Sequence, residues 1–419
     1  MDAREQRGLI IAATCKLKQT SDGTWVVPSQ TNTDKLYQVD MKTKKCTCPD
    51  HAENGFTCKH YYAASYTFKR DYMPDGTMIE TKQITITQKT TYKQDWRAYN
   101  LAQCTEKHRF QELLFDLTRG IVEPPVHEGR GNIPHSVKDS VFAMAYKVYS
   151  TFSGRRFQCD LNDAFEKDYI SRKIPWQKVA EMLDKETLTP ILKELIGYSA
   201  RPLRGVESTF AIDSSGFSVN KFERFFDHKH GTTRFKHAWV KVHLCCGTKT
   251  NVVTAVRILD KDAADSPQFV PLVRETKRHF TISEVSADKA YGSLENFEEI
   301  AKCKGQAYIA FKSNHTGAVG GHFEKAFHYF QFKNEEYMQH YHKRSNVEST
   351  FSAIKRKFGD SIRSRTEVAM VNECLCKILC HNICCLIQEQ CELGIEPIFW
   401  KDEKREANEE SGYLRVSRA

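Results

Sequence analysis

The sequence contains no apolar run long enough to cross a lipid bilayer. None of its segments approaches the roughly 20 apolar residues that a membrane-spanning helix needs. The first residues, MDAREQRGLIIAATCKLK, also lack the longer apolar core and the small-residue cleavage site of a secretory signal peptide. No internal repeat is visible, so a membrane protein, an exported protein and a repeat protein are not expected.

The chain also has no strong excess of one charge. It contains 62 Lys and Arg against 53 Asp and Glu, a net charge of +9, which permits a nucleic-acid partner without establishing one. With 40% hydrophobic and 27% charged residues, the composition argues against a wholly disordered chain. A length of 419 residues suggests two or three domains.

Cysteine is abundant, with 15 residues, an odd number. Without an export signal, this indicates a reducing compartment with free thiols and metal ligands instead of a disulfide framework. Cys376, Cys380 and Cys384 recur every four residues in the last predicted helix. A metal site is one interpretation, but we expect core packing, because free cysteine is among the most buried residue types.

The pattern along the chain predicts four parts. Residues 1–92 read as short strands followed by a Cys/His cluster, and residues 93–205 place apolar residues at helical spacings of three and four. The helical part suits either DNA binding or a structural spacer. In residues 206–392 strands alternate with helices, which predicts an α/β domain with a mixed sheet. Residues 393–419 form a charged tail.

Two close pairs of metal-ligand residues lie in the first part. Cys46 and Cys48 form C-x-C, and Cys58 and His60 form C-x-H. Three thiolates and one imidazole complete a tetrahedral zinc set and leave no position for a substrate water. We therefore expect one structural Zn²⁺. The pattern resembles the SWIM zinc finger, which implies binding of DNA or of a protein partner.

Two acidic residues follow apolar strands in the third part. Asp213 ends FAID and Asp288 ends EVSAD, and the carboxyl end of a strand is where α/β sheets present catalytic groups. Carboxylates are the hard oxygen ligands that divalent ions prefer. Two acids at two strand ends can share a pair of such ions, which suits phosphodiester chemistry.

A third acid is predicted on a helix near residues 341–358. At 100° per residue, four polar residues fall within an arc of about 60° on one face of this helix: Tyr341, Arg344, Glu348 and Lys355. A separate apolar stripe would bury the helix against the sheet: Val347, Phe351, Ile354 and Phe358. From residue 341 to 365 there are seven Lys and Arg against two acids, which suits a site beside a phosphate backbone.

A further segment, residues 222–243, is rich in Lys, Arg and aromatic residues and carries His228, His230, His237 and His243. Contact with DNA through phosphates and stacked bases is one interpretation. A solvated strand-and-loop surface is the other, and the sequence leaves the choice open.

The acids and the helix together resemble the DDE transposases of the insertion-sequence type. The residues that carry the resemblance are IDSSGFS at Asp213, ADKAYGS at Asp288, and the Y-x2-R-x3-E-x6-K signature from Tyr341 to Lys355. The resemblance implies a retroviral-integrase-like, RNase H-like catalytic domain. It implies two Mg²⁺ (or Mn²⁺) ions held by Asp213, Asp288 and Glu348.

The same resemblance implies a function. Water would cleave DNA strands at the ends of a mobile element, and the freed 3′-hydroxyl would attack target DNA. Tyr341, Arg344 and Lys355 would hold the DNA backbone, and the enzyme would work as a homodimer or a larger assembly. A cytoplasmic, nucleoid-associated protein of a prokaryote is then expected.

One feature departs from the family pattern. Some relatives carry a large strand-rich insertion between the second Asp and the Glu, whereas here 348 − 288 leaves only 60 positions. A step that depends on the insertion, such as hairpin formation, is therefore in doubt. Two alternatives stay open: a Tyr341 nucleophile, and a catalytically silent DNA-binding protein derived from a transposase.

Overall fold

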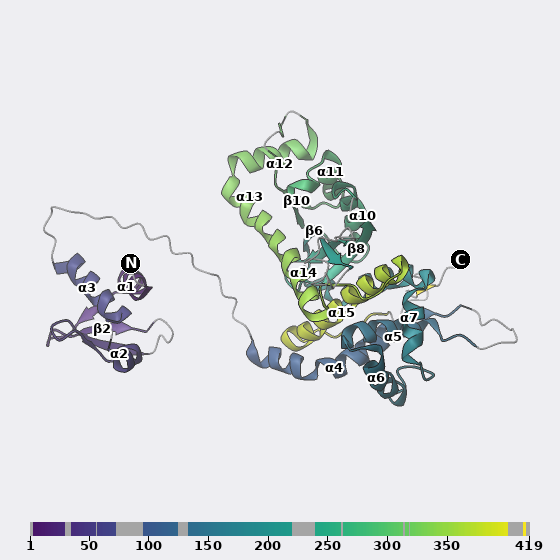
Figure 1. Cartoon of the computed structure of the whole chain (residues 1–419). Coiled ribbons are helices and arrows are strands. Elements are labelled where there is room, and N and C mark those ends of the chain that lie inside the picture. The colour runs from purple at the N-terminus through teal and green to yellow at the C-terminus, as the bar shows by residue number, and fades with distance from the viewer. Residues whose placement is uncertain are drawn as a thin grey trace, which may run out of the picture. The chain divides into compact units, whose positions relative to one another are not determined.

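The computed structural model describes residues 3–29, 35–55, 57–72, 95–124, 133–219, 239–260, 263–312, 315–317, 319–400 and 414–415. Most of the basic segment 222–243, including His228, His230 and His237, lies outside these ranges. The chain forms two compact units, residues Met1–Lys93 and Gln94–Ala419. Each unit is described by itself (Figure 1).

The first unit is a small α+β module. Its antiparallel sheet has the order β1-β2-β3-β4, with β1 at Lys18–Gln19, β2 at Trp25–Pro28, β3 at Leu36–Asp40 and β4 at Lys45–Cys46. The helices are α1 (Ala3–Thr14), α2 (Pro49–Asn54) and α3 (Lys59–Tyr72). Helices α1 and α3 lie so close that a Cβ on Gly8 would sit 2.4 Å from the Cβ of Tyr62. Glycine at this position therefore allows the two backbones to approach.

The second unit is built on a five-stranded mixed sheet. Its order is β10-β9-β6-β7-β8, with β6 at Thr209–Ser218, β7 at Trp239–Gly247, β8 at Val253–Asp260, β9 at Glu284–Ala287 and β10 at Gln306–Ile309. Strands β6, β7 and β8 pair antiparallel, and β9 and β10 run parallel to β6. This confirms the predicted mixed sheet and the RNase H-like arrangement, in which the longest strand lies at the centre.

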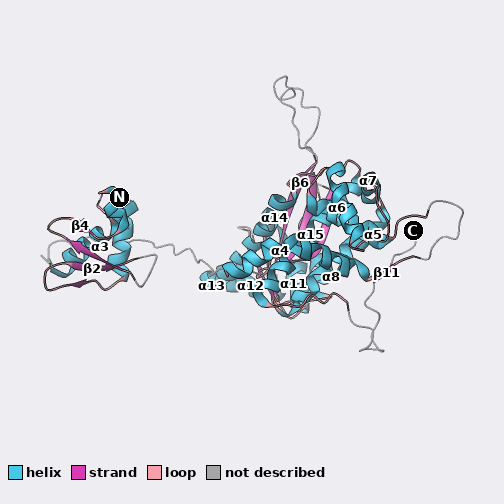
Figure 2. Ribbon diagram, turned by 90° about the horizontal axis from the view of Figure 1, so that it is seen from below, coloured by secondary structure: helices cyan, strands magenta, loops and turns pink. Residues whose placement is uncertain are grey.

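Figure 2 shows helices of the third part beside the strands of this sheet. These helices are α10 (Ser266–Lys277), α11 (Leu294–Lys302), α12 (Gly321–Phe332), α13 (Asn334–Tyr341), α14 (Ser345–Phe358) and α15 (Glu367–Leu393). Helix α12 packs mainly on α11 and α13. The predicted apolar stripe of α14 is buried and packs against β6 and β7. Burial of that stripe holds the opposite side of α14, which carries Glu348, in solvent.

The helical part precedes the sheet in the sequence and packs against α15. It comprises α4 (Trp96–Arg119), α5 (Val137–Ser150), α6 (Gly154–Glu166), α7 (Trp176–Leu183) and α8 (Thr189–Ala200). Figure 1 shows α4 to α7 gathered at one end of the unit. Buried Asn382 on α15 donates to the carbonyls of Ile196 on α8 and Val253 on β8. The segments before and after residue 205 therefore share one hydrophobic core. The domain boundary that the sequence predicts at this residue stays a prediction.

Two of the three cysteines expected to pack in the core, Cys376 and Cys380, lie in it, and Cys384 is half-buried against it. Cys376 and Cys380 are fully buried, and the Cys380 thiol donates to the carbonyl of Ala145 on α5 at 3.2 Å. Contrary to the sequence expectation, α15 is long and apolar enough to cross a membrane. However, 78% of its most apolar window is buried inside the structure. The helix therefore provides no evidence of a membrane.

Buried histidine makes the stability of the second unit depend on pH. His381 on α15 is 7% exposed and donates to the Asn251 carbonyl at 2.9 Å, and burial lowers its pKa to about 4. The unfolded chain takes up this proton first, near pH 6.5, so stability is lost as the pH falls from 6.5 to 4. We expect a loss of about 3 kcal/mol from His381 over this range.

The measurement is urea unfolding at several pH values. His381→Gln should flatten the pH dependence by that amount. Equal pH profiles for the wild type and His381→Gln would contradict the prediction.

Candidate functional site

The first two acids lie side by side on neighbouring parallel strands. Contrary to the sequence expectation, Asp213 does not end its strand, because β6 continues to Ser218 and pairs with β7 throughout, whereas Asp288 directly follows β9. Ile212 on β6 is in register with Ala287 on β9, and Asp213 and Asp288 are the residues that follow. Neighbouring strands are about 4.8 Å apart, and residues in register point to the same face. Sheet topology therefore brings together two carboxylates that are 75 positions apart in the sequence.

The electrostatics of Asp213 show that the third acid is near as well. Burial raises the pKa of Asp213, and the negative charges of Asp288 and Glu348 raise it further. The backbone N–H of Ser214 and the Arg344 guanidinium act in the opposite direction. Repulsion among three carboxylates is the condition that a bound cation relieves.

The helix that carries the third acid differs from the sequence expectation. Tyr341 ends α13, Arg344 ends a short 3₁₀ turn, η4 (His342–Arg344), and Glu348 and Lys355 lie on α14. The four residues are therefore not on one continuous helix. A 3₁₀ turn advances about 120° per residue instead of 100°, so it turns Tyr341 away from the line of Glu348 and Lys355. The turn packs against β6 and β9, the strands of the two aspartates.

Arg344 joins two of the three acids. One guanidinium nitrogen, Nη1, lies 2.6 Å from Asp213 Oδ2, and the other, Nη2, lies 2.5 Å from Glu348 Oε1. A cation therefore already lies between the aspartate on β6 and the glutamate on α14. Among the described residues, the three acids do not form a cluster whose ligand atoms all lie within 4.8 Å of one another. Arg344 thus occupies part of the space between them.

Asp213 and Glu348 also line one cavity of about 500 Å³. Its other lining residues are mostly polar: Ser214, Ser215, Phe351, Ser352, Lys355, Arg356 and Asp360. Lys355 is fixed, because its Nζ donates to Ser215 Oγ at 2.7 Å and lies over the Phe217 ring. Asp288 and Tyr341 are not among the residues that line this cavity. We call this cavity the acidic groove.

Sequence reasoning missed a polar layer behind the aspartates. Asp265 accepts from Lys241 at 2.6 Å and from Ser214 Oγ at 3.2 Å. Behind it, buried His243 is 3.2 Å from the Tyr291 hydroxyl. Burial lowers the pKa of His243 to about 4 and raises the pKa of Tyr291. The sequence signal that could have indicated this polar layer was Tyr291, which lies three residues after Asp288 in ADKAYGS.

His243 also settles part of an open question. It was one of four histidines in the basic segment, and the sequence left DNA contact and solvated surface as alternatives. In the structure it lies on β7 with no exposed side-chain area, facing Ser214 across the strand pair. This histidine therefore belongs to the core and is not on the surface.

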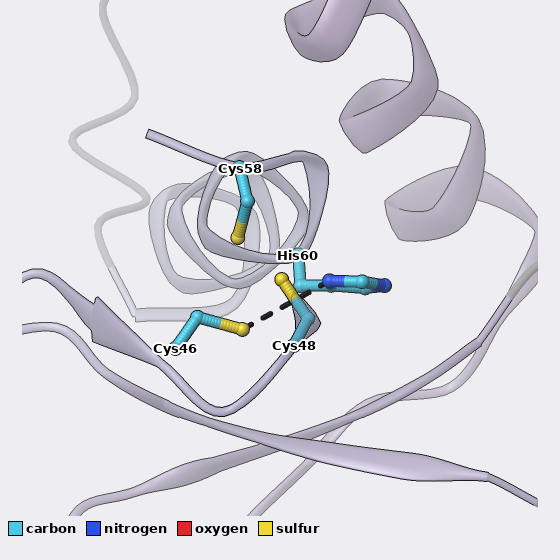
Figure 3. A group of neighbouring side chains, drawn as sticks. All are labelled: Cys46, Cys48, Cys58 and His60. Atoms are coloured by element: carbon cyan, nitrogen blue, oxygen red, sulfur yellow. Dashed lines mark hydrogen bonds between the residues drawn. The ribbon is translucent and has the colours of Figure 1, made fainter. Parts of the chain in front are cut away.

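The four predicted zinc ligands converge in the first unit (Figure 3). Cys46 lies on β4, Cys48 precedes α2, Cys58 precedes α3, and His60 is in the first turn of α3. All four are buried, and their ligand atoms lie within 4.8 Å of one another. A tetrahedral Zn²⁺ with bonds of about 2.3 Å needs sulfur atoms about 3.8 Å apart, so the donor set fits this ion.

The polar contacts within this set are those of a metal site. Cys46 Sγ lies 3.9 Å from His60 Nδ1, and the other ring nitrogen of His60 has no hydrogen-bond partner. A hydrogen bond to Cys58 raises the pKa of Cys46, while the same contact lowers the pKa of Cys58. Three thiols that share so little space cannot all ionise without a cation among them.

Comparisons with known proteins agree with both sites. The family model of the transposase DDE domain matches residues 204–383, a range that contains all three acids. The model of the SWIM zinc finger matches residues 37–69, which contain the four zinc-ligand candidates. A cryo-EM structure of a piggyBac transposase synaptic complex with hairpin DNA is 10% identical, covers 68% of this chain and 79% of that chain, and has a TM-score of 0.30.

Because this TM-score is low, the family assignment rests on the two family models alone. Their matched ranges contain the mixed sheet of the second unit and the Cys/His cluster of the first. The chain therefore carries a transposase DDE domain, the domain of a DNA-cleaving and DNA-joining enzyme, together with an N-terminal SWIM zinc finger.

Proposed function

We propose that this protein is a DNA transposase that cuts and joins strands at the ends of a mobile element by two-metal phosphoryl transfer. The observation that supports it most is the placement of Asp213 beside Asp288, with Arg344 linking Asp213 to Glu348. Packing alone does not explain why three acids from two strands and one helix lie together, because aliphatic residues at these positions would stabilise the fold better.

Asp213, Asp288 and Glu348 would hold two Mg²⁺ or Mn²⁺ ions. Their carboxylates are the hard ligands that these ions prefer. The pKa of Asp213 is raised by burial and, to a smaller extent, by the charges of Asp288 and Glu348. When bound, such ions activate the attacking oxygen and stabilise the leaving one. The lysine and arginine side chains of η4 and α14 would bind the DNA phosphates beside the acids.

A tyrosine nucleophile fits the structure less well. Burial raises the pKa of Tyr341, and the charges of Asp288 and Asp213 raise it further. The phenolate needed for attack is therefore disfavoured. Tyr341 is better suited to hold a phosphate or a sugar through a neutral hydroxyl.

Zinc bound by Cys46, Cys48, Cys58 and His60 would stabilise the first unit. That unit would recognise element ends or a partner subunit. The partners we propose are element-end DNA, target DNA and a second copy of the chain, on the nucleoid of a prokaryotic cell.

The test is strand cleavage on the DNA that flanks the coding region. We expect nicking at terminal inverted repeats that requires Mg²⁺ or Mn²⁺, followed by joining to a target plasmid. Binding to these repeats without nicking in either metal would favour the silent DNA-binding alternative.

The position of Arg344 predicts competition with the metal. Arg344→Gln removes the guanidinium that pairs with Asp213 and Glu348. A charge-assisted contact contributes about 1.5–3 kcal/mol, so we expect Mn²⁺ to bind about tenfold more tightly in calorimetry. Strand cleavage should nevertheless fall, because a phosphate ligand is lost. Lys343→Gln in the same turn, which removes a contact to Glu284, is the control for the calorimetry and should leave Mn²⁺ affinity unchanged. Unchanged Mn²⁺ affinity in Arg344→Gln would contradict this account.

A further inference from the structure

A second cavity of about 500 Å³ lies among α5, α6, α7, the first turns of α15 and the segment 363–366 that precedes α15. We call it the aromatic cavity. We propose that it binds one unstacked base of the DNA strand that passes through the acidic groove. This inference rests on the proposed function, because it takes DNA as the molecule in that groove.

Two aromatic side chains offer stacking faces. Phe152 is 47% exposed, although it lines a cavity. Trp176 packs closely on Gly154, where a Cβ would lie 2.5 Å from the ring atom Cε3, and the backbone N–H of Trp176 donates to Gln158 Oε1 at 2.8 Å. Val148, Val179 and Leu183 add apolar walls. Stacking on such faces accepts any base, since every base has a π-face.

Cationic side chains surround these rings. Lys147, Arg363, Arg365 and Lys377 line the cavity, against two carboxylates, Asp184 and Glu373. Glu373 accepts the backbone N–H groups of Arg363 and Ser364, so much of its hydrogen-bonding capacity is used.

The positive charges of Arg363 and Arg365 are available to a ligand. The Arg363 guanidinium donates to the Thr151 carbonyl at 2.7 Å, and within the described residues neither Arg363 nor Arg365 forms an ion pair with a carboxylate. Both side chains are exposed. The aromatic cavity is therefore apolar inside and has a net positive charge at its edge. These properties suit a base with its phosphate better than an apolar peptide.

The aromatic cavity adjoins the acidic groove. Asp360 lines the groove, while Phe358 and Arg363, on either side of it in the sequence, line the cavity. Ser361 also bridges Ser218 at the end of β6, five residues after Asp213. Five strand residues span about 16 Å, which is about five phosphates of one DNA strand. A strand cut at the acids therefore reaches the cavity within a few nucleotides.

The test uses two DNA probes in Ca²⁺ buffer, so that no cleavage is needed. One is a blunt duplex, and the other is the same duplex with a short oligo-dT overhang that carries a single 2-aminopurine. Phe152→Ala should weaken binding of the overhang probe about tenfold, restore 2-aminopurine fluorescence, and change blunt-duplex affinity less than about twofold. Arg365→Ala should weaken overhang binding in the same direction.

Matched controls come from exposed residues elsewhere. Phe332→Ala on α12, 82% exposed, and Arg204→Ala should leave overhang binding unchanged. The inference is overturned if Phe152→Ala behaves like Phe332→Ala, or if it weakens both probes equally.

The outcomes separate this inference from the proposed function. If the wild type nicks element ends but Phe152→Ala keeps full overhang affinity, only the base site is wrong. If the overhang binds through Phe152 but no divalent metal supports nicking, the transposase activity is wrong and the base site stands. Glu348→Gln should stop nicking and leave overhang binding intact.

Discussion

Asp213→Asn should lower metal-dependent strand cleavage by about 10³-fold or more. The amide is close in size to the carboxylate, but it removes the negative charge that a divalent ion needs. The fold should survive, because the retained oxygen can still accept the Ser214 N–H, which lies 2.8 Å away. Asp288→Asn and Glu348→Gln should have effects of similar size, since the three residues act as one set.

The measurement is nicking and joining of terminal-repeat DNA in Mg²⁺ and in Mn²⁺, with DNA affinity measured in parallel. Glu335→Gln removes an exposed carboxylate on α13 and is the matched control, which should cleave at the wild-type rate. Joining that persists in Asp213→Asn would contradict the three-acid site and favour a Tyr341 nucleophile.

Loss of zinc should unfold the first unit and leave the second one folded. In that unit Cys46, Cys48 and Cys58 are part of the small hydrophobic core. A unit of about 90 residues buries too little apolar surface to lose a structural metal without effect. The binding free energy of structural zinc is about 10 kcal/mol or more, so Cys46→Ser combined with Cys48→Ser should abolish the folding of residues 1–93.

Thermal unfolding followed by circular dichroism, with zinc content measured separately, checks this result. A chelator should reproduce the effect of the double substitution on the wild-type chain. Cys15→Ser, a half-buried cysteine of the same unit outside the ligand set, should keep both zinc and fold. If residues 94–419 melt at a lower temperature in the double variant, the two units are not independent.

The interval between Asp288 and Glu348 bears on what the enzyme can do. In the described part of it the elements are η3 (Lys289–Tyr291), α11, β10, α12, α13 and η4, so β10 of the main sheet is its one strand. The large strand-rich insertion of some relatives therefore has no equivalent among these residues. A hairpin step that depends on that insertion is not part of our proposal.

The sequence alone predicted the features that depend on short-range order. The zinc set follows from two ligand pairs within 15 residues, and the structure gathers the same four side chains. Asp213 and Asp288 were found because each follows a short apolar stretch that reads as a strand. The expectation that Asp213 ends its strand was wrong, because β6 continues to Ser218 by pairing with β7. The buried stripe of α14 follows from its helical period.

Tertiary structure decided the features that depend on distant parts of the chain. The helical arc of Tyr341, Arg344, Glu348 and Lys355 was wrong in detail, because η4 packs against β6 and β9 and interrupts the helix. Arg344 between two acids, Asp265 behind Asp213, and the aromatic cavity all join residues far apart in sequence. Side-chain period fixes which face a residue occupies, but only the packing of one element on another fixes what lies opposite that face.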